Sequence, residues 1–229
     1  MFRIFITGDT HASLSWEKVN TKKFPIQKEL TKDDLLIIAG DFGGVWDNGT
    51  GDKYVLDAYE SRNFTTLFVD GNHENFPLLS TFPVEEFHGG KVHRIRDSVY
   101  HLMRGQVYDF GGRTFFTFGG ATSHDRIWRQ AGIDWWPEEL PSEAELKEAE
   151  RNLEACGYKV DYVISHCCPR RALSELGLIK FYTEDRLNRF FDYLTEDKGL
   201  QFKKWYFGHY HEDMEIGPWN LLFNTIEEI

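Results

Sequence analysis

The sequence predicts an α/β protein, because buried strands and a helix alternate along its first third. Three apolar runs, at 2–7, 35–39 and 65–69, each end at a glycine or an Asp-Gly pair, as buried strands commonly do. Residues 53–62, between the second and third runs, carry apolar side chains on one side and are expected to form a helix. Apolar strands joined by a helix are typical of a parallel sheet covered on both faces.

The middle of the chain has a different pattern, in which short strands follow one another closely. Gly105 and the pair Gly111-Gly112 mark turns between them. We expect an antiparallel meander with strands at 92–95, 98–102, 106–110 and 114–118. Histidines 88, 93 and 101 have no ligand-like spacing here, and we interpret them as packing or surface residues.

The last part of the chain returns to helices and strands in alternation. Ser142, with Glu145 three residues later, predicts a capping box at the start of a helix that runs to about Ala155. A second helix is expected over 184–195. The remaining expected strands lie at 162–164 and 205–207 and near 214–216 and 221–223.

Length and charge limit the class of protein. A chain of 229 residues without repeats or a linker is expected to form one domain, residues 1–229. The net charge of −11 argues against extended nucleic acid as a partner, because such binding needs a basic face. No apolar run could span a membrane, and a cleaved leader would remove the cluster at Asp9, so we expect a cytoplasmic protein. The sequence does not indicate the oligomeric state.

Five polar clusters stand where predicted strands end, and they carry the functional prediction. They read Gly8-Asp9-Thr10-His11, Gly40-Asp41, Gly71-Asn72-His73-Glu74, Ser165-His166 and Gly208-His209-Tyr210-His211. Imidazole, carboxylate and amide oxygen bind first-row divalent metals in hydrolytic sites. Since ligands bind at the carboxyl ends of strands in α/β sheets, folding is expected to gather these clusters.

Seven side chains in these clusters are candidate metal ligands, more than the four that one zinc-sized ion needs. They are Asp9, His11, Asp41, Asn72, His166, His209 and His211. Seven ligands that include a bridging carboxylate such as Asp41 suit two ions. The adjacent Cys167 and Cys168 are expected to be small buried residues beside the site, with a thiolate ligand as the alternative.

The balance of charge in such a site favours a phosphorylated substrate. Two carboxylates against two divalent ions leave the site positive although the protein is acidic, so an anionic phosphate is attracted to it. A water bridging two cations has its pKa lowered toward about 7, and the resulting hydroxide can attack phosphorus. The residues therefore predict metal-dependent hydrolysis of a phosphomonoester or a phosphodiester.

The order Asp-x-His, Gly-Asp, Gly-Asn-His-Glu, Ser-His, Gly-His-x-His resembles that of the calcineurin-like metallophosphoesterases, from Asp9 to His211. The resemblance implies a four-layer αββα sandwich of mixed sheets with a dinuclear metal centre. It implies that His73 is the catalytic histidine near the leaving group and that Glu74 orients it. The implied ligands are Asp9, His11, Asp41 and His211 for one ion, and Asp41, Asn72, His166 and His209 for the other.

The chain departs from the family pattern at two places. Glycine usually follows the first histidine, whereas this chain has Ala12, which asks for ordinary backbone angles there. The Gly-Asp-x-Val-Asp-Arg-Gly run of the Ser/Thr protein phosphatases is absent after Gly40, and with it that subgroup's phosphate-binding arginine. The amino-acid sequence of the clusters therefore does not imply a protein substrate.

Residues that could select the substrate follow the last strand of the expected meander. His124 and Arg126 are predicted to contact the substrate, since an arginine fork suits phosphate oxygens. Tryptophans at 128, 135 and 136 could stack a nucleobase, although such residues more often belong to the core or a lid. The expected substrate is a phosphorylated small molecule or a nucleotide.

Two alternatives to a general phosphoesterase remain. One is a nuclease or nucleotide phosphodiesterase, which the acidic charge disfavours only for long nucleic acid. The other is a non-catalytic metal-binding scaffold, which predicts lost ligands or a lost His73, and all of these positions are filled. Mixed nitrogen and oxygen ligands allow several divalent or mixed-valence metal pairs, with manganese, iron or zinc expected.

Overall fold

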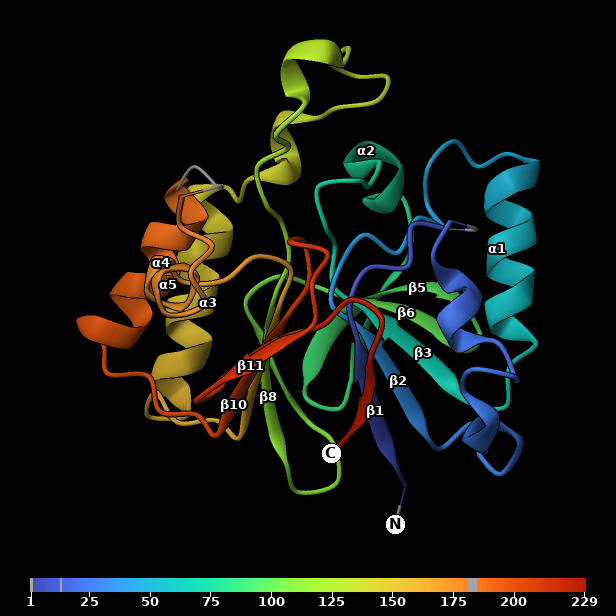
Figure 1. Ribbon diagram of the computed structural model, residues 1–229, viewed down its shortest axis with the longest axis horizontal. Coiled ribbons are helices and arrows are strands. Elements are labelled where there is room, and N and C mark those ends of the chain that lie inside the picture. Colours follow the sequence, from blue (N-terminus) through green and yellow to red (C-terminus); the bar gives the residue numbers. More distant parts are fainter. Residues whose placement is uncertain (1, 13, 181–184) are drawn as a thin grey trace.

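The computed structural model describes residues 2–12, 14–180 and 185–229, and in it two sheets pack face to face between helices (Figure 1). Helix α1 (Thr50–Glu60) lies outside one sheet. Helices α3 (Glu143–Ala155), α4 (Arg170–Glu175) and α5 (Arg186–Glu196) lie outside the other. The predicted α/β class, as a four-layer αββα sandwich of mixed sheets, is confirmed.

The first sheet contains the three strands predicted at the start of the chain. Its order is β13 (Ile226–Glu228), β1 (Ile4–Thr7), β2 (Leu35–Ile38), β3 (Thr65–Phe68), β6 (Val99–Leu102), β5 (Gly90–Arg96) and β4 (Val84–Phe87). Strands β1, β2, β3 and β6 run parallel, whereas β13, β5 and β4 pair antiparallel with their neighbours. The parallel strands therefore end at one edge of the sheet.

The second sheet is also mixed. Its order is β11 (Met214–Ile216), β12 (Trp219–Leu221), β10 (Lys204–Phe207), β9 (Tyr162–Ser165), β8 (Thr114–Phe118) and β7 (Gln106–Asp109). Strands β8, β9, β10 and β12 are parallel, and β7 and β11 are antiparallel edge strands.

Alternation along the strands builds the layers, because neighbouring residues of a strand point to opposite faces. In β1, Ile4 and Ile6 pack between the two sheets. Phe5 faces outward and packs on Phe24, with ring centroids 5.0 Å apart, in the cluster that also contains Val55 and Leu56 of α1. Both faces of this strand are apolar, so it reads as a continuous hydrophobic run.

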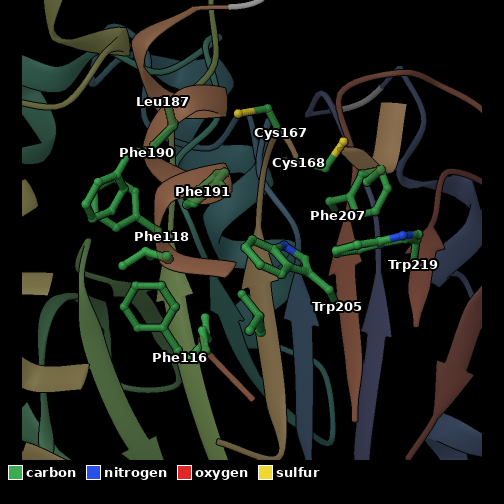
Figure 2. Packing of buried hydrophobic residues seen from close by; sticks show 14 of the residues in the cluster. Phe116, Phe118, Cys167, Cys168, Leu187, Phe190, Phe191, Trp205, Phe207 and Trp219 are labelled. Atoms are coloured by element: carbon green, nitrogen blue, oxygen red, sulfur yellow. The ribbon is translucent and has the colours of Figure 1, made fainter. Parts of the chain in front are cut away.

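The outer face of the second sheet packs against α3, α4 and α5 in an aromatic core (Figure 2). Figure 2 shows Cys167 and Cys168 beside this core. Both are buried free thiols, and burial raises the pKa of each. Cys167 and Cys168 are therefore small buried residues, as expected. Neither belongs to a group of possible metal ligands among the described residues.

The expected antiparallel meander is wrong. Its four strands form in the predicted places, but β5 and β6 belong to the first sheet and β7 and β8 to the second. Strand β6 has β3 on one side and β5 on the other, so no free edge remains for β7. The chain crosses between sheets through Gly105, whose φ is +73°. Periodicity located the strands but could not identify their partners.

Several short elements were not predicted. These are β4, β13, α4, helix α2 (Phe76–Leu79) and the 3-10 helices η1 (Trp16–Val19), η2 (Pro25–Lys28), η3 (Arg126–Trp128) and η4 (Pro137–Glu139). The capping box of Ser142 and Glu145 forms as expected. Helix α5 begins at Arg186 after an Asp185 N-cap, and its expected start at position 184 lies outside the described residues.

The three histidines set aside as packing or surface residues are held by ordinary contacts. His101 is buried and lies 3.0 Å from Asp70, while the Nδ1 atoms of His93 and His101 lie 2.9 Å apart. His88 pairs through Nδ1 with a backbone oxygen, 3.1 Å away. None of the helices in the described part of the chain is both long and apolar enough to cross a membrane.

Ala12 does not have the ordinary backbone angles expected for it. Its φ is +52°, and that of His11 is +42°, so both lie in the left-handed region that disfavours a Cβ atom. Hydrogen bonds from the Ala12 N–H to the Phe42 carbonyl (3.0 Å) and from the His11 N–H to the Asp41 carbonyl (2.7 Å) impose this conformation. The alanine occupies a backbone shape that suits glycine.

We expect Ala12→Gly to raise the free energy of unfolding by about 0.5–1 kcal/mol. Release of left-handed strain contributes about 1–2 kcal/mol, and the flexibility of glycine in the unfolded chain takes back about 0.4–1 kcal/mol. Urea denaturation measures the difference. The control Ala58→Gly, inside α1, should instead lower stability by about 1 kcal/mol. A loss of stability in Ala12→Gly would contradict the strain argument.

Candidate metal centre

The five polar clusters meet where the parallel strands of both sheets end. Asp9, Asp41 and Asn72 follow β1, β2 and β3 of the first sheet, and His166 and His209 follow β9 and β10 of the second. The clusters are tied to each other by backbone donors. The His209 N–H donates to Asp9 Oδ1 (2.9 Å) and the His73 N–H donates to Asp41 Oδ1 (2.8 Å).

A first group of possible ligands consists of Asp9, His11 and His211, whose donor atoms all lie within 4.8 Å of one another. His211 Nε2 is 3.0 Å from Asp9 Oδ2 and 3.0 Å from His11 Nε2. His11 Nε2 also lies 3.7 Å from Asp41 Oδ2. Two ring nitrogens and one carboxylate oxygen therefore converge on one point, and Asp41 lies next to them.

A second group consists of Asp9, Asp41 and His166, all fully buried. His166 Nε2 lies 3.4 Å from Asp41 Oδ1 and 3.1 Å from Asn72 Oδ1. The ring of His209 is next to it, with centroids 5.0 Å apart. The structure thus brings all seven predicted ligands together, although the carboxylate that the two groups share is Asp9 and not Asp41, which was expected to bridge.

The donor set fits cations. Asp9 Oδ2 is buried without a regular hydrogen bond among the described residues. Its near neighbours are the ring nitrogens of His211 (3.0 Å) and His11 (3.5 Å), and a buried carboxylate oxygen needs a partner such as a cation. Burial is the largest effect on Asp9 and on Asp41 and would raise the pKa of each, but the neighbouring histidines, His166 first, together hold both pKa values below the usual range. Burial would lower the pKa of His166, yet Asp41 and Asp9 raise it to about 10. Two adjacent buried carboxylates attract positive charge, as a cation site should.

The orientation of His166 is set from the opposite side of its ring. Nδ1 lies 2.8 Å from the carbonyl oxygen of Ala39, at the end of β2. In the neutral ring that a metal ion would require, a hydrogen bond from Nδ1–H to this carbonyl leaves the lone pair on Nε2, which faces Asp41 and Asn72. Such an outer hydrogen bond is the usual way to fix a metal-binding histidine.

Two glycines of the clusters are required by close approach. A Cβ atom on Gly71 would lie 1.9 Å from Asp41 Oδ1, and one on Gly208 would lie 2.0 Å from Asp9 Oδ1. Any larger residue would push a carboxylate away from its partners. These two glycines therefore make room for the ligand of another segment.

The amide of Asn72 is oriented by two residues that the sequence analysis did not identify. Asn72 Nδ2 donates to Ser123 Oγ (3.2 Å), and Ser123 Oγ donates its own proton to Glu139 Oε2 (2.6 Å). Because this proton is committed to the carboxylate, Ser123 can only accept from Asn72, which fixes the NH₂ group on that side. The carbonyl oxygen of Asn72 is thereby turned toward His166 and the ligand group.

His73 lies beside the ligand groups but belongs to neither of those found among the described residues. Its ring packs edge-on against His11, with centroids 5.5 Å apart. Arg129 Nη2 is 3.2 Å from His73 Nε2. Burial first, and then the Arg129 charge, lower the pKa of His73 despite Asp41.

Glu74 does not orient His73 as the resemblance implied. Its Oε1 accepts a hydrogen bond from the Phe42 N–H (2.9 Å), and Oε2 has no partner among the described residues. Burial, and then the charge of Asp41, raise the pKa of Glu74. The side chain is therefore directed to the loop after β2, which carries Phe42.

The two predicted substrate contacts lie on the segment after β8. His124 stacks on His209, with ring centroids 5.1 Å apart, and so stands next to a predicted ligand. Arg126 is exposed on η3, and its contact with the substrate stays a prediction. Arg129, three residues later, is the arginine that the structure places against His73.

Lys18 is another residue that sequence reasoning missed. It is buried, and Nζ donates to the carbonyls of Gly8 (3.0 Å), Asp9 (2.7 Å) and Phe223. Burial lowers its pKa to about 8. Lys18, Ser123 and Glu139 act through contacts distant in sequence, so no local motif marks them. For Arg129, the signal in the sequence was its place three residues after Arg126, on the segment already expected to contact the substrate.

Glu139→Gln is expected to weaken metal binding, because its amide can donate to Ser123 and free the Ser123 proton to point at Asn72. The Asn72 amide would then be driven to flip, with its NH₂ group toward the ligands. A loss of about 10- to 100-fold in metal affinity is typical of such outer contacts, and calorimetric titration with Mn²⁺ measures it. Glu138→Gln, at an exposed neighbour, is the control. Equal affinity in both variants would contradict this role of Glu139.

Comparison with known proteins agrees with this arrangement. No curated protein matches the chain. The family model described as calcineurin-like phosphoesterase matches residues 2–213, which include all seven candidate ligands and His73. The chain therefore belongs to the calcineurin-like phosphoesterases, which are metal-dependent hydrolases of phosphoesters.

Proposed function

We propose that this protein hydrolyses a phosphomonoester or a phosphodiester with the help of two metal ions. The observation that supports a pair of ions is that two ligand groups share the buried carboxylate of Asp9. The proposed ligands are Asp9, His11, Asp41, Asn72, His166, His209 and His211. When bound, such ions would polarise a phosphoryl oxygen and supply a water nucleophile of lowered pKa.

Manganese, iron or zinc are the proposed metals. The ligand set mixes imidazole nitrogen with carboxylate and amide oxygen, which suits first-row metals better than Mg²⁺ or Ca²⁺. Two divalent ions would outweigh the two carboxylates of the site, so that a phosphate anion is attracted despite the net charge of −11.

His73 is the proposed catalytic residue. It stands against His11, and its backbone is held by Asp41, so its ring stays close to both ligand groups without joining them. From this place an imidazole can stabilise or protonate the leaving oxygen. We propose that Glu74 supports it indirectly, by holding the loop after β2 through the Phe42 N–H.

A nuclease or nucleotide phosphodiesterase is the second candidate. Trp128 is 84% exposed and Ile127 is 77% exposed, on the same segment as His124 and Arg129. An exposed indole beside a phosphate-processing site can stack a nucleobase. The acidic net charge favours a small nucleotide over a long nucleic acid.

Protein purified without added metal should contain about two equivalents of manganese, iron or zinc by elemental analysis. It should hydrolyse at least one of p-nitrophenyl phosphate, bis-p-nitrophenyl phosphate and a cyclic nucleotide. A chelator should abolish turnover and lower the free energy of unfolding by about 2.7 kcal/mol for each bound ion that had been present at 100 times its Kd. One equivalent with full turnover would contradict the ion pair, and full metal without turnover on any ester would favour the scaffold.

His73→Asn should lower kcat by about 10²- to 10⁴-fold, the usual contribution of a proton-transfer residue. Metal content should stay unchanged, because His73 is proposed not to be a ligand. Steady-state kinetics on the best ester of the panel, together with elemental analysis of the same sample, check this. Joint loss of activity and metal would identify His73 as a ligand.

A further inference from the structure

We infer that Arg129 is a positioning residue for His73, held rigid by the loop that carries it. This inference rests on the proposed catalytic role of His73. The carrying observation is the contact of 3.2 Å between Arg129 Nη2 and His73 Nε2. It joins a loop after β8 of the second sheet to the cluster after β3 of the first.

The guanidinium is fixed on three sides. Arg129 Nε donates to Asp125 Oδ1 (2.7 Å) and Nη2 donates to Asp125 Oδ2 (2.8 Å), which makes a two-point ion pair. Nη1 donates to the carbonyl of Asp134 (2.9 Å). The Arg129 side chain is only 14% exposed. A guanidinium held in this way is pre-organised, unlike a free surface arginine.

The loop is closed on itself around this arginine. The Gln130 N–H donates to Asp134 Oδ1 (2.5 Å), and the Gly132 N–H donates to the carbonyl of Trp135 (2.8 Å). Asp125 and Asp134, on either side of Arg129, therefore aim its planar group in one direction. That direction is toward the imidazole of His73.

The contact selects one form of the histidine. A guanidinium has N–H donors and no acceptor, so His73 Nε2 must accept the hydrogen bond through its lone pair. The ring proton of neutral His73 is then on Nδ1. Arg129 thereby sets both the rotation of the ring and the nitrogen that carries the proton, which a catalytic imidazole needs to have defined.

The number of N–H groups that Arg129 already uses argues against Arg129 as the main phosphate ligand. Of its five N–H groups, two serve Asp125, one serves Asp134 and one serves His73. Two-point recognition of a phosphate needs two parallel N–H groups. To supply them, Arg129 would have to break its ion pair with Asp125 or leave His73.

The test compares Arg129→Met with wild type on two readouts. Turnover of bis-p-nitrophenyl phosphate and p-nitrophenyl phosphate should show kcat lowered by about 10- to 100-fold, as expected for a displaced catalytic group, with KM nearly unchanged. In Zn²⁺-loaded protein with ¹⁵N-labelled histidine, the ring nitrogens of His73, assigned with His73→Asn, should lose their distinct protonated and unprotonated signals.

A double-mutant cycle shows whether Asp125 acts through Arg129. Asp125→Ala should also lower kcat, and the double variant Asp125→Ala/Arg129→Met should be no slower than Arg129→Met alone. Gln130→Ala, an exposed side chain on the same loop, and Arg151→Met, which removes a positive charge on α3, should both keep wild-type kinetics.

Two results would overturn the inference. A raised KM with unchanged kcat in Arg129→Met would make Arg129 a substrate ligand. Unchanged ring ¹⁵N signals of His73 in that variant would show that the arginine does not position the ring. Failure of the proposed function is a separate result. The wild-type protein would then hydrolyse no ester of the panel, or His73→Asn would keep full turnover, while the ¹⁵N spectra of wild type and Arg129→Met would still report the contact.

Discussion

The structure depends on the burial of two carboxylates, Asp9 and Asp41, at the ends of neighbouring parallel strands. Both are at most 1% exposed, and a buried charge is tolerated only when it is paired or bound to a cation. Their partners come from both sheets: the N–H groups of His73 and His209, and the ring of His166. Satisfying these two groups holds the ends of the two sheets together and creates a place for positive charge.

This arrangement imposes strain on the residues that take part in it. His11, Asp41, His209 and His211 all have positive φ, which non-glycine residues rarely adopt. Strained backbone persists only where the surroundings over-determine it, and it concentrates at functional sites. Here the His11 N–H is fixed by the Asp41 carbonyl, and the His209 N–H by Asp9, so that each strained segment is held by the ligand of another.

Residues outside the ligand groups, on a loop of the second sheet, orient side chains that follow the first sheet. The loop after β8 supplies Ser123, which turns the Asn72 amide, and Arg129, which contacts His73. Both residues are held by carboxylates, Glu139 and Asp125. Near the site, acidic side chains therefore hold the two residues that contact Asn72 and His73.

The local pattern of the sequence was sufficient for the fold class, for the positions of the main strands, and for the polar clusters at their ends. Apolar periodicity and glycine punctuation are short-range signals, and each cluster such as Gly8-Asp9-Thr10-His11 contains its own chemistry. Only the tertiary structure decided that β6 and β7 lie in different sheets, that Glu74 faces Phe42, and that Ser123, Glu139 and Arg129 complete the site. Strand partners and outer contacts depend on which edges and donors remain free after packing, and that competition joins residues distant in sequence.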